Sequence, residues 1–244
     1  MTRLDQLLVQ KGEFPSREKA RRTIMAGKVR VDGQVVDKPG TSIGPSASIE
    51  VAEPAEPFVS RGGRKLAGAL DHFAVAVDAL VCLDVGASTG GFTDCMLQRG
   101  ALRVYAVDVG YGQLDYSLRQ DERVIVMERV NARHLTVDDL PELCDLATFD
   151  LSFISLSKVV PAVARLVKPG GRLITLVKPQ FEVGKGRVGK GGIVRDEAVR
   201  REVIEERVAE LEAAGLESHG WIDSPITGAR GNLEALALFT RREM

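Results

Sequence analysis

The chain has 244 residues, 44% of them hydrophobic, and a formal net charge of −1 at pH 7, which excludes an intrinsically disordered protein. Its most apolar segment, residues 74–85, is interrupted by two aspartates, so we expect neither a membrane span nor a secretion signal. The cysteines Cys82, Cys95 and Cys144 have no C-x-x-C spacing, which predicts a cytoplasmic protein without a metal site or a disulfide.

Residues 1–52 form the first predicted unit, which begins with two helices. Leu4 and Leu8 give a short first helix one apolar face. Ser16 is a typical N-cap, and the basic stretch 17–26 after it predicts a second helix. Residues 1–52 carry nine Lys/Arg against six Asp/Glu, a net charge of +3, and two later clusters within residues 61–65 and 185–195 are also basic. Together they predict an anionic partner, whereas any one cluster alone is better explained as solvated surface charge.

A hairpin and a linker follow these helices. Two short apolar strands, 29–31 and 34–36, flank Asp32-Gly33, a pair that readily adopts the positive φ angles of a two-residue turn. The stretch AEPAEP then contains two prolines, which favour an extended and rather stiff chain. We therefore place an interdomain linker at residues 53–59 and a second domain at 60–244.

The second domain alternates between strand-like and helix-like segments. Helices are expected near 64–73 and 196–214. This alternation predicts an α/β fold in which helices cover both faces of a parallel sheet. Strands are expected near residues 80–84, 102–107, 123–127, 145–150, 171–177, 217–223 and 233–240.

The stretch VCLDVGASTGGF is the most informative part of the chain. Its strand ends at Asp84 and continues into a turn where Gly86 and Gly90–Gly91 let the backbone approach a ligand closely. Another strand ends at Asp108, 18 residues beyond Gly90, where a carboxylate can accept both hydroxyls of a ribose. The pattern predicts a site for a nucleotide-type cofactor.

Spacing distinguishes the possible cofactors. Ala87 and Ser88 follow Gly86, which does not fit the dinucleotide pattern G-x-G-x-x-G. The segment GKGRVGKG resembles a triphosphate loop, but Gly191 stands where a hydroxyl is needed. The remaining pattern, D-x-G-x-x-x-G-G-F with a later acid, resembles the S-adenosylmethionine site of Rossmann-like methyltransferases. The alternative is a plain strand, turn and helix whose glycines serve packing alone.

Four charged residues lie at the carboxyl ends of the predicted strands or beside the sheet: Lys65, Asp150, Lys178 and Glu234. Each alone could be a buried ion-pair partner, but together, after a cofactor turn, they predict one site. In this order they resemble the Lys-Asp-Lys-Glu tetrad of FtsJ-type ribose 2′-O-methyltransferases. That resemblance implies that Lys178 acts as a base or stabilises a developing alkoxide, while the two acids orient the lysines.

The N-terminal pattern L-x-x-L-L…S-R-x-x-A-x-x-x-I-x-x-G-x-V-x-V-D-G resembles the αL-type RNA-binding domain found in a small-subunit ribosomal protein, in pseudouridine synthases and in bacterial tyrosyl-tRNA synthetases. With FVSRGGRKL, DVGASTGGFTDCML, FDLSFISL, LVKPQFE and GNLEALALF in this order, the whole chain resembles the TlyA-type rRNA methyltransferases, the hemolysin A family. The resemblance implies a small α+β RNA-binding domain followed by a Rossmann-like, FtsJ-like methyltransferase domain that uses S-adenosylmethionine.

The resemblance also implies an activity and its residues. The expected reaction is ribose 2′-O-methylation of a cytidine in rRNA, of the large subunit first and the small subunit second, by a cytoplasmic monomer acting on ribosomal subunits. Cofactor binding is assigned to Asp84, Gly86, Ser88, Gly90, Gly91, Phe92, Asp108 and Asn131. RNA binding is assigned to Arg3, Arg17, Lys19, Arg21, Arg22, Lys28, Arg61, Arg64, Lys185, Arg187 and Lys190.

Other interpretations stay open at this point. A pseudouridine synthase uses an Asp in an Arg-Leu-Asp segment, and the nearest match, Gln113-Leu114-Asp115, lacks the Arg. A non-catalytic RNA-binding or ribosome assembly factor, or a hemolysin as the family name suggests, are the alternatives. The chain also has EPFV at residues 56–59, where relatives can have Arg-x-Trp-Val. The glycine-rich segment 184–195 is either a surface loop or a loop that closes over RNA.

Overall fold

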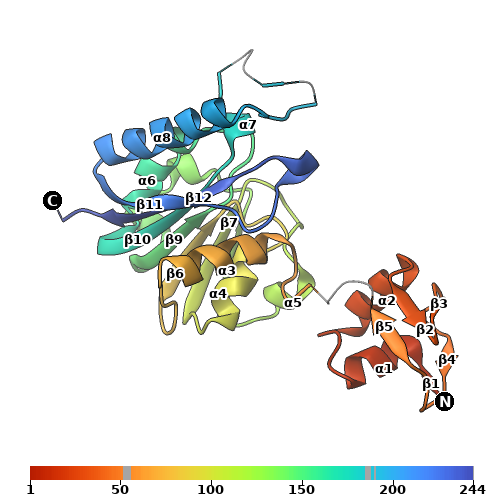
Figure 1. Ribbon diagram of the computed structural model, residues 1–244. Coiled ribbons are helices and arrows are strands. Elements are labelled where there is room, and N and C mark those ends of the chain that lie inside the picture. The colour runs from red at the N-terminus through yellow and green to blue at the C-terminus, as the bar shows by residue number, and fades with distance from the viewer. Residues whose placement is uncertain (52–55, 185–187, 190, 244) are drawn as a thin grey trace. The chain divides into compact units, whose positions relative to one another are not determined.

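The computed structural model describes residues 1–51, 56–184, 188–189 and 191–243, and the chain forms two compact units, Met1–Pro57 and Phe58–Met244 (Figure 1). Residues 53–55 of the predicted linker lie outside the described residues. The second unit begins two residues earlier than we predicted. Phe58 packs against Gly63, and the backbone N–H of Val59 donates to Asp94 Oδ2 at 2.7 Å.

The first unit has the two predicted helices, α1 (Leu4–Gln10) and α2 (Arg17–Met25). Ser16 caps α2, because its side chain accepts a hydrogen bond from the backbone N–H of Lys19 at 3.3 Å. One apolar cluster joins both helices to the strands that follow them. Its buried members are Leu4, Leu8, Phe14, Ala20, Ile24, Val29 and Ile43.

The strands of the first unit include the predicted hairpin. Asp32 and Gly33 have φ angles of 52° and 79°, as a two-residue turn of this type requires. A strand that we did not predict extends the hairpin to three strands in the order β3-β2-β5, and β1 pairs with β4. The strands are β1 (Thr2–Arg3), β2 (Val29–Val31), β3 (Gln34–Val35), β4 (Ser42–Ile43) and β5 (Ile49–Val51).

The second unit contains a seven-stranded sheet within its described residues, and the predicted strand positions are confirmed to within a few residues. The strands are β6 (Val81–Val85), β7 (Arg103–Asp108), β8 (Val124–Glu128), β9 (Cys144–Phe149), β10 (Val167–Val177), β11 (Leu216–Asp223) and β12 (Ala235–Arg241). Their order is β11-β12-β10-β9-β6-β7-β8.

The prediction of a parallel sheet is wrong for one strand. Strands β6, β7, β8, β9 and β10 run parallel to one another, but β12 runs antiparallel to both β10 and β11. The reason lies in the connection from β11 to β12, residues 224–234, which contains a short 3₁₀ turn instead of a crossover helix. A strand that pairs with the preceding strand without a crossover must return antiparallel.

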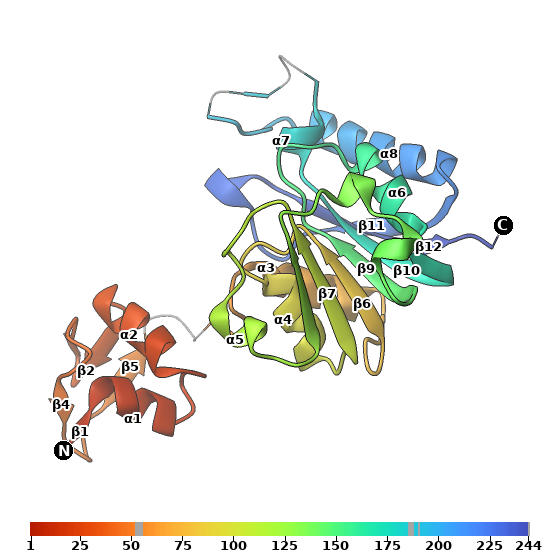
Figure 2. The ribbon, with the colours of Figure 1, turned by 180° about the vertical axis from the view of Figure 1, so that it is seen from behind.

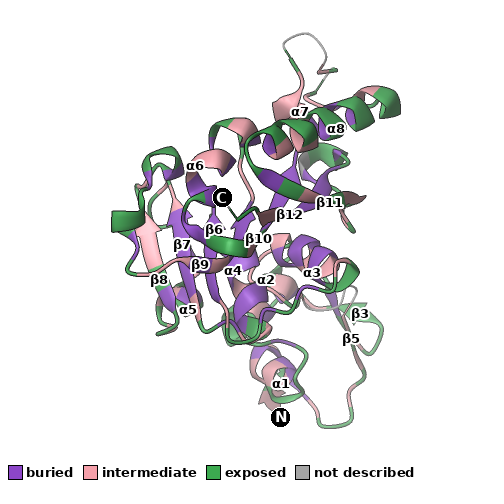
Figure 3. Ribbon diagram, turned by 90° about the vertical axis from the view of Figure 1, so that its left-hand side faces the viewer, coloured by how far each residue is buried: buried purple, intermediate pink, exposed green. Residues whose placement is uncertain are grey.

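Helices cover both faces of the sheet, with α3 and α4 on one face and α6 and α8 on the other (Figure 1, Figure 2). Side chains alternate along β6, so that Cys82 joins the cluster under α3 and α4 while Leu83 joins the other cluster. The central strands are accordingly buried (Figure 3). The helices are α3 (Gly62–His72), α4 (Gly91–Gln98), α5 (Tyr116–Arg119), α6 (Val160–Ala164), α7 (Pro179–Glu182) and α8 (Glu197–Ala213). The 3₁₀ helices are η1 (Ala132–His134), η2 (Val137–Asp139), η3 (Leu156–Lys158) and η4 (Ala229–Gly231).

Candidate active site

The turn after β6 requires its glycines. Gly86 has a φ of +85°, and a Cβ built on it would lie 2.6 Å from the carbonyl oxygen of Asp150. Gly91, the first residue of α4, approaches α3 so closely that a Cβ would lie 2.2 Å from Ser60 Oγ. Gly90 packs against Leu118 and lines neither of the two cavities described below. The turn therefore packs closely between the carboxyl end of β9 and the amino end of α3.

Asp108, at the end of β7, holds the same turn from its other side. Its Oδ2 accepts the backbone N–H of Ser88 at 2.8 Å, and its Oδ1 accepts the backbone N–H of Gly110 at 2.7 Å. Ser88 has a left-handed φ of 49°, a strained conformation for a residue with a side chain. The turns after β6 and β7 are thus fixed to each other by one carboxylate.

A cavity of about 440 Å³, here called the Asp108 cavity, opens beside these turns. Most of its lining is apolar, and the polar members are Ser88, Asp108, Gln113, Asn131, Asp150 and Ser152. Asn131 also accepts the backbone N–H of Arg133 at 3.1 Å and so caps η1. The lining residues are Val85, Gly86, Ser88, Val107, Asp108, Val109, Gln113, Val130, Asn131, Ala132, Asp150, Leu151, Ser152, Phe153, Ile154 and Val159.

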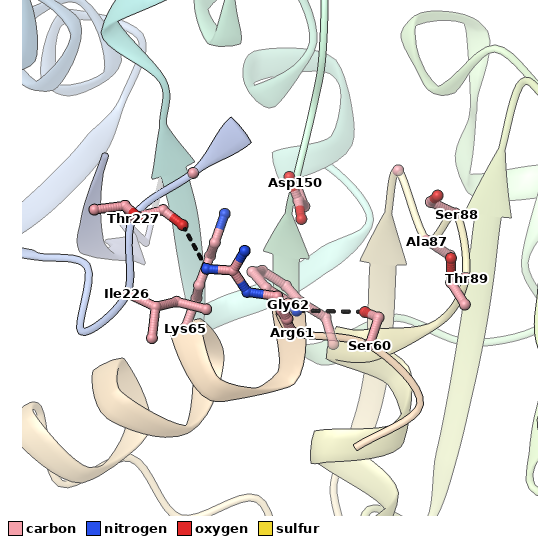
Figure 4. Close-up of a pocket in the computed structure, with 14 residues that line it drawn as sticks. Ser60, Arg61, Gly62, Lys65, Ala87, Ser88, Thr89, Asp150, Ile226 and Thr227 are labelled. Carbon is pink, nitrogen blue, oxygen red and sulfur yellow. Dashed lines mark hydrogen bonds between the residues drawn. The ribbon is translucent and has the colours of Figure 1, made fainter. Parts of the chain in front are cut away.

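A second cavity of about 290 Å³, here called the Lys65 cavity, shares Gly86 with the Asp108 cavity and is shown in Figure 4. The first turns of α3 and α4 line it, together with Phe92 and the loop Ile226–Gly228. Arg61 connects that loop to α3, because its Nη2 donates to the carbonyl oxygen of Thr227 at 3.2 Å. Gly86, Ser88 and Asp150 line both cavities, so the cavities are neighbours.

The four predicted catalytic residues form two ion pairs. Lys178 Nζ lies 2.5 Å from Asp150 Oδ1, and Lys65 Nζ lies 2.5 Å from Glu234 Oε2. The side chains of both lysines are 11% exposed, that of Glu234 is 2% exposed and that of Asp150 is 25% exposed. Because Lys65 and Asp150 line the same cavity, the two ion pairs meet at one site.

Three neighbours of the ion pairs were not predicted. Ser152 Oγ accepts a hydrogen bond from Lys178 Nζ at 3.0 Å, and Gln180 Nε2 donates to Glu234 Oε1 at 3.0 Å. The loop Ile226–Gly228 also approaches Glu234, because a Cβ on Gly228 would lie 2.1 Å from Glu234 Oε1. Ser152 and Gln180 each stand two residues after a tetrad member, and that proximity in sequence was the available signal.

Asp84 does not lie where a direct contact with the cofactor would place it. It lines neither cavity, and its fully buried side chain accepts hydrogen bonds from Thr93 Oγ1 at 2.6 Å and Thr148 Oγ1 at 3.2 Å. The alternation along β6 turns Asp84 toward α4 and Val85 toward the Asp108 cavity. Burial raises the pKa of Asp84 to about 7.

The predicted RNA-binding residues are distributed over both units. In the first unit Arg17, Arg21, Arg22 and Lys28 are exposed, while Lys19 is half-buried and its Nζ donates to the carbonyl oxygen of Glu56. In the second unit Arg61 lines the Lys65 cavity, and Arg64 is half-buried on α3. Lys185, Arg187 and Lys190 lie outside the described residues, so the structure does not describe the middle of the glycine-rich segment.

A buried carboxylate organises two of these arginines. Asp5 is fully buried, and it pairs with Arg3 at 3.1 Å and with Arg17 at 2.9 Å. These arginines, Arg3 foremost, lower the pKa of Asp5 to about 2. Among the described residues there is no cluster of three or more metal-ligating side chains, and no helix is long and apolar enough to cross a membrane.

Comparison with known families agrees with this geometry. A family model described as "FtsJ-like methyltransferase" matches residues 58–241, and a model described as "S4 domain" matches residues 2–49. The chain therefore belongs to the FtsJ-like methyltransferases. Its fold also resembles that of the N-methyltransferase NodS from Bradyrhizobium japonicum in complex with S-adenosyl-l-homocysteine, at 16% identity and a TM-score of 0.53 over 74% of this chain and 87% of that one.

Relatives covering nearly the whole chain define the family more narrowly. The "16S/23S rRNA (cytidine-2'-O)-methyltransferase TlyA" of Mycobacterium tuberculosis is 48% identical over 95% of this chain and 87% of the relative. "Hemolysin A" of Brachyspira hyodysenteriae is 41% identical over 97% and 99%. The structure "Putative hemolysin from Streptococcus thermophilus" is 43% identical over 99% and 89%, with a TM-score of 0.78. The chain is a member of the TlyA/hemolysin A family, which confirms the predicted family and fold class.

Proposed function

We propose that this protein transfers a methyl group from S-adenosylmethionine to the ribose 2′-hydroxyl of a cytidine in rRNA. The observation that carries the proposal is the pair of lysine–carboxylate contacts in and beside the Lys65 cavity, next to a cavity suited to the cofactor. The name of the Mycobacterium tuberculosis relative, an rRNA (cytidine-2'-O)-methyltransferase, supports this substrate, because that relative is 48% identical over 95% of this chain.

The Asp108 cavity fits the adenosyl part of the cofactor. Its volume of about 440 Å³ and largely apolar lining suit an adenine ring. Each carboxylate oxygen of Asp108 accepts one backbone N–H and keeps a lone pair for a ribose hydroxyl. Gly86 and Ser88 line both cavities, so their backbone would lie along the middle of the cofactor. When bound, S-adenosylmethionine supplies an electrophilic methyl group on a sulfonium.

The tetrad acts on the hydroxyl that receives this group. A ribose hydroxyl is a poor nucleophile, because its oxygen must lose a proton while the new bond forms. Lys178 stabilises the developing alkoxide when it is an ammonium, or takes up this proton when its amine is neutral, and Asp150 and Ser152 hold its Nζ in place. Lys65 adds a second ammonium group, which Glu234 orients from β12. Holding the reacting atoms in line supplies much of the remaining rate enhancement.

The first unit would hold the rRNA. It carries exposed arginines and a lysine on and just after α2, and the S4 domain that it matches is the RNA-binding module expected from the sequence. Charged side chains of this kind bind the phosphate backbone and provide affinity in a salt-dependent manner. We propose that the enzyme acts in the cytoplasm as a monomer on ribosomal subunits, with large-subunit rRNA as its main target and small-subunit rRNA as the second.

Methyl transfer from labelled S-adenosylmethionine into purified 30S and 50S subunits, prepared from a strain that lacks this protein, tests the proposal. We expect 2′-O-methylcytidine in 50S rRNA with the wild type and a loss of at least about 100-fold with Lys178→Ala. Lys168→Ala is the matched control, because Lys168 also pairs with an aspartate but lies far from the site at the start of β10. Cofactor binding without incorporation into either subunit or free rRNA would contradict the rRNA assignment.

A further inference from the structure

The four-residue helix α7 follows Lys178 directly, at the edge of the sheet where β9 and β10 end and β12 begins. In the sheet order, β10 runs between β12, which Glu234 precedes, and β9, which Asp150 follows. A helix of one turn has little stability of its own, so side-chain contacts must hold it. Two of its side chains, Gln180 and Glu182, reach toward the two neighbouring strands.

Gln180 reaches toward β12. Its Nε2 donates to Glu234 Oε1 at 3.0 Å, and the other carboxylate oxygen of Glu234 pairs with Lys65. Gln180 Oε1 is buried and has no hydrogen-bond partner among the described residues. An amide oxygen that is buried without a hydrogen-bond partner lowers the stability of the folded protein. An amide is expected in such a place when its NH₂ group makes a contact that the protein uses. The contact with Glu234 therefore accounts for the amide at this position.

Glu182 reaches toward the segment that follows β9. Its Oε1 accepts the backbone N–H of Leu156 at 2.9 Å, at the end of the segment 150–156. That segment supplies Asp150 and Ser152, the two partners of Lys178 Nζ. The Glu182 side chain is only 2% exposed, and burial raises its pKa. Burying a carboxyl group costs more folding free energy than burying an apolar side chain of the same size. The contact of Glu182 with Leu156 is therefore expected to serve the site.

Arg207 on α8 lies behind Glu182. Its Nε is 3.9 Å from Glu182 Oε2, and neither of these two buried atoms has a hydrogen-bond partner in the described part of the chain. Its Nη1 donates to Ser155 Oγ at 3.4 Å and to Glu210 Oε2 at 2.6 Å. Arg207 therefore approaches both the carboxyl group of α7 and the segment to which that carboxyl group is bonded.

We propose that Gln180 and Glu182 are positioning residues for the methyl transfer. Gln180 fixes Glu234 and, through it, Lys65, while Glu182 fixes the segment 150–156 relative to Lys178. This inference rests on the proposed function. Neither residue touches the reacting atoms, but a displacement of about 1 Å in a catalytic group can cost about a hundredfold in rate.

The Glu182 half of the proposal predicts a split between turnover and binding. In Glu182→Leu the N–H of Leu156 loses its acceptor, and we expect kcat to fall roughly 10- to 100-fold. The KM for S-adenosylmethionine and the Kd for S-adenosylhomocysteine should change much less than kcat, because Glu182 itself lines neither cavity, although the segment 150–156 contributes residues 150–154 to the Asp108 cavity. Glu182→Gln keeps an oxygen for Leu156 and should restore kcat to within about threefold of the wild type.

Glu210→Leu is the matched control for Glu182→Leu. Glu210 contacts Arg207 at 2.6 Å on the exposed side of α8, and it makes no hydrogen bond or ion pair with the segment 150–156 among the described residues. We expect a wild-type kcat from this variant. Gln180→Leu should lower kcat about tenfold, because it releases Glu234 and, through it, Lys65.

Three results would overturn the proposal. These are a wild-type kcat in Glu182→Leu, a Glu182→Gln variant as slow as Glu182→Leu, and a loss of S-adenosylhomocysteine affinity that parallels the loss of kcat. If the wild type binds S-adenosylhomocysteine but methylates no rRNA, the proposed function fails, and NMR of ¹³C-labelled lysines decides on positioning. The Cε signals of Lys178 in Glu182→Leu and of Lys65 in Gln180→Leu should then shift, but not in Glu210→Leu; unshifted signals would contradict the proposal.

Discussion

The Asp108 cavity and the Lys65 cavity share Gly86, Ser88 and Asp150 but have opposite characters. The Asp108 cavity is lined mainly by apolar side chains, and its carboxylate is held by backbone N–H groups. The Lys65 cavity is lined by the first turns of two helices and by side chains of two ion pairs. The Asp108 cavity is thus suited to bind a ligand by the fit of its apolar walls, and the Lys65 cavity is suited to interact with charge.

This difference indicates that cofactor binding and methyl transfer depend on different residues at the same edge of the sheet. Cofactor affinity should depend on the backbone of the glycine turn and on Asp108, because apolar walls bind through fit. Turnover should depend on the ion pairs, because groups that interact with developing charge act mainly in the transition state. Substitutions on one side should therefore change Kd, and substitutions on the other should change kcat.

Gly86→Ala should have the largest effect, because Gly86 belongs to both cavities. Its φ of +85° and the 2.6 Å distance from a built Cβ to the Asp150 carbonyl oxygen require both strain and a backbone shift. We expect methyl transfer to fall more than about 100-fold and S-adenosylhomocysteine affinity more than about tenfold, measured by filter binding and calorimetry. Gly112→Ala, with a φ of +71° and nothing within 4 Å of its Cβ, isolates the strain and should keep both properties.

Lys65→Met should impair methyl transfer in the Lys65 cavity without changing cofactor binding. We expect kcat to fall about 100-fold at an unchanged Kd for S-adenosylhomocysteine. The variant also leaves Glu234 buried without its cation, which should lower the free energy of unfolding by about 3 kcal/mol. The double variant Lys65→Met/Glu234→Gln should recover stability, measured by urea unfolding, without recovering activity. Recovery of activity in the double variant would show that Lys65 serves only to neutralise Glu234.

Asp108→Ala should produce the reverse pattern. A charged hydrogen-bond acceptor contributes about 1.5–3 kcal/mol, so we expect S-adenosylhomocysteine to bind roughly 10- to 100-fold more weakly. At saturating S-adenosylmethionine, kcat should stay within about threefold of the wild type, because Asp108 does not line the Lys65 cavity. A fall in kcat as large as that of Lys65→Met would contradict the separation of the two cavities.

Sequence patterns predicted the strands and the tetrad because both depend on local signals. Apolar runs mark the strands, and Asp150 and Lys178 directly follow two of them. The antiparallel direction of β12 was not predicted, because the apolar pattern of a strand does not depend on the direction in which the strand runs. The direction is determined by the connection that precedes the strand.

Side-chain direction was harder to predict than position. The motif D-x-G marked Asp84 as part of the cofactor turn, but it does not state toward which face of the sheet the carboxyl group points. The contacts of Gln180 and Glu182 were missed for a similar reason, since their partners lie 54 and 26 residues away in the chain. Proximity to Lys178 in the sequence marks the helix that carries both residues, but the partners of their side chains depend on tertiary packing.

Asp84→Asn should have the smallest effect, because Asp84 lies outside both cavities. Its pKa in the folded protein is about 7, above the unfolded value near 3.9, so the folded state binds the extra proton between these values. The contribution of Asp84 to stability is therefore full below about pH 4 and is lost as the pH rises to about 7. Asparagine keeps an acceptor for Thr93 and does not titrate.

The difference in unfolding free energy between Asp84→Asn and the wild type should thus grow in favour of the variant by about 3 kcal/mol between pH 4 and pH 7. Taking the difference removes the contributions of Asp5 and Glu182, which are the same in both proteins. S-adenosylhomocysteine affinity should change less than about twofold. If Asp84 contacted the cofactor instead, the variant would lose affinity as Asp108→Ala does, while a pH-independent difference would show that Asp84 is ionised in the fold.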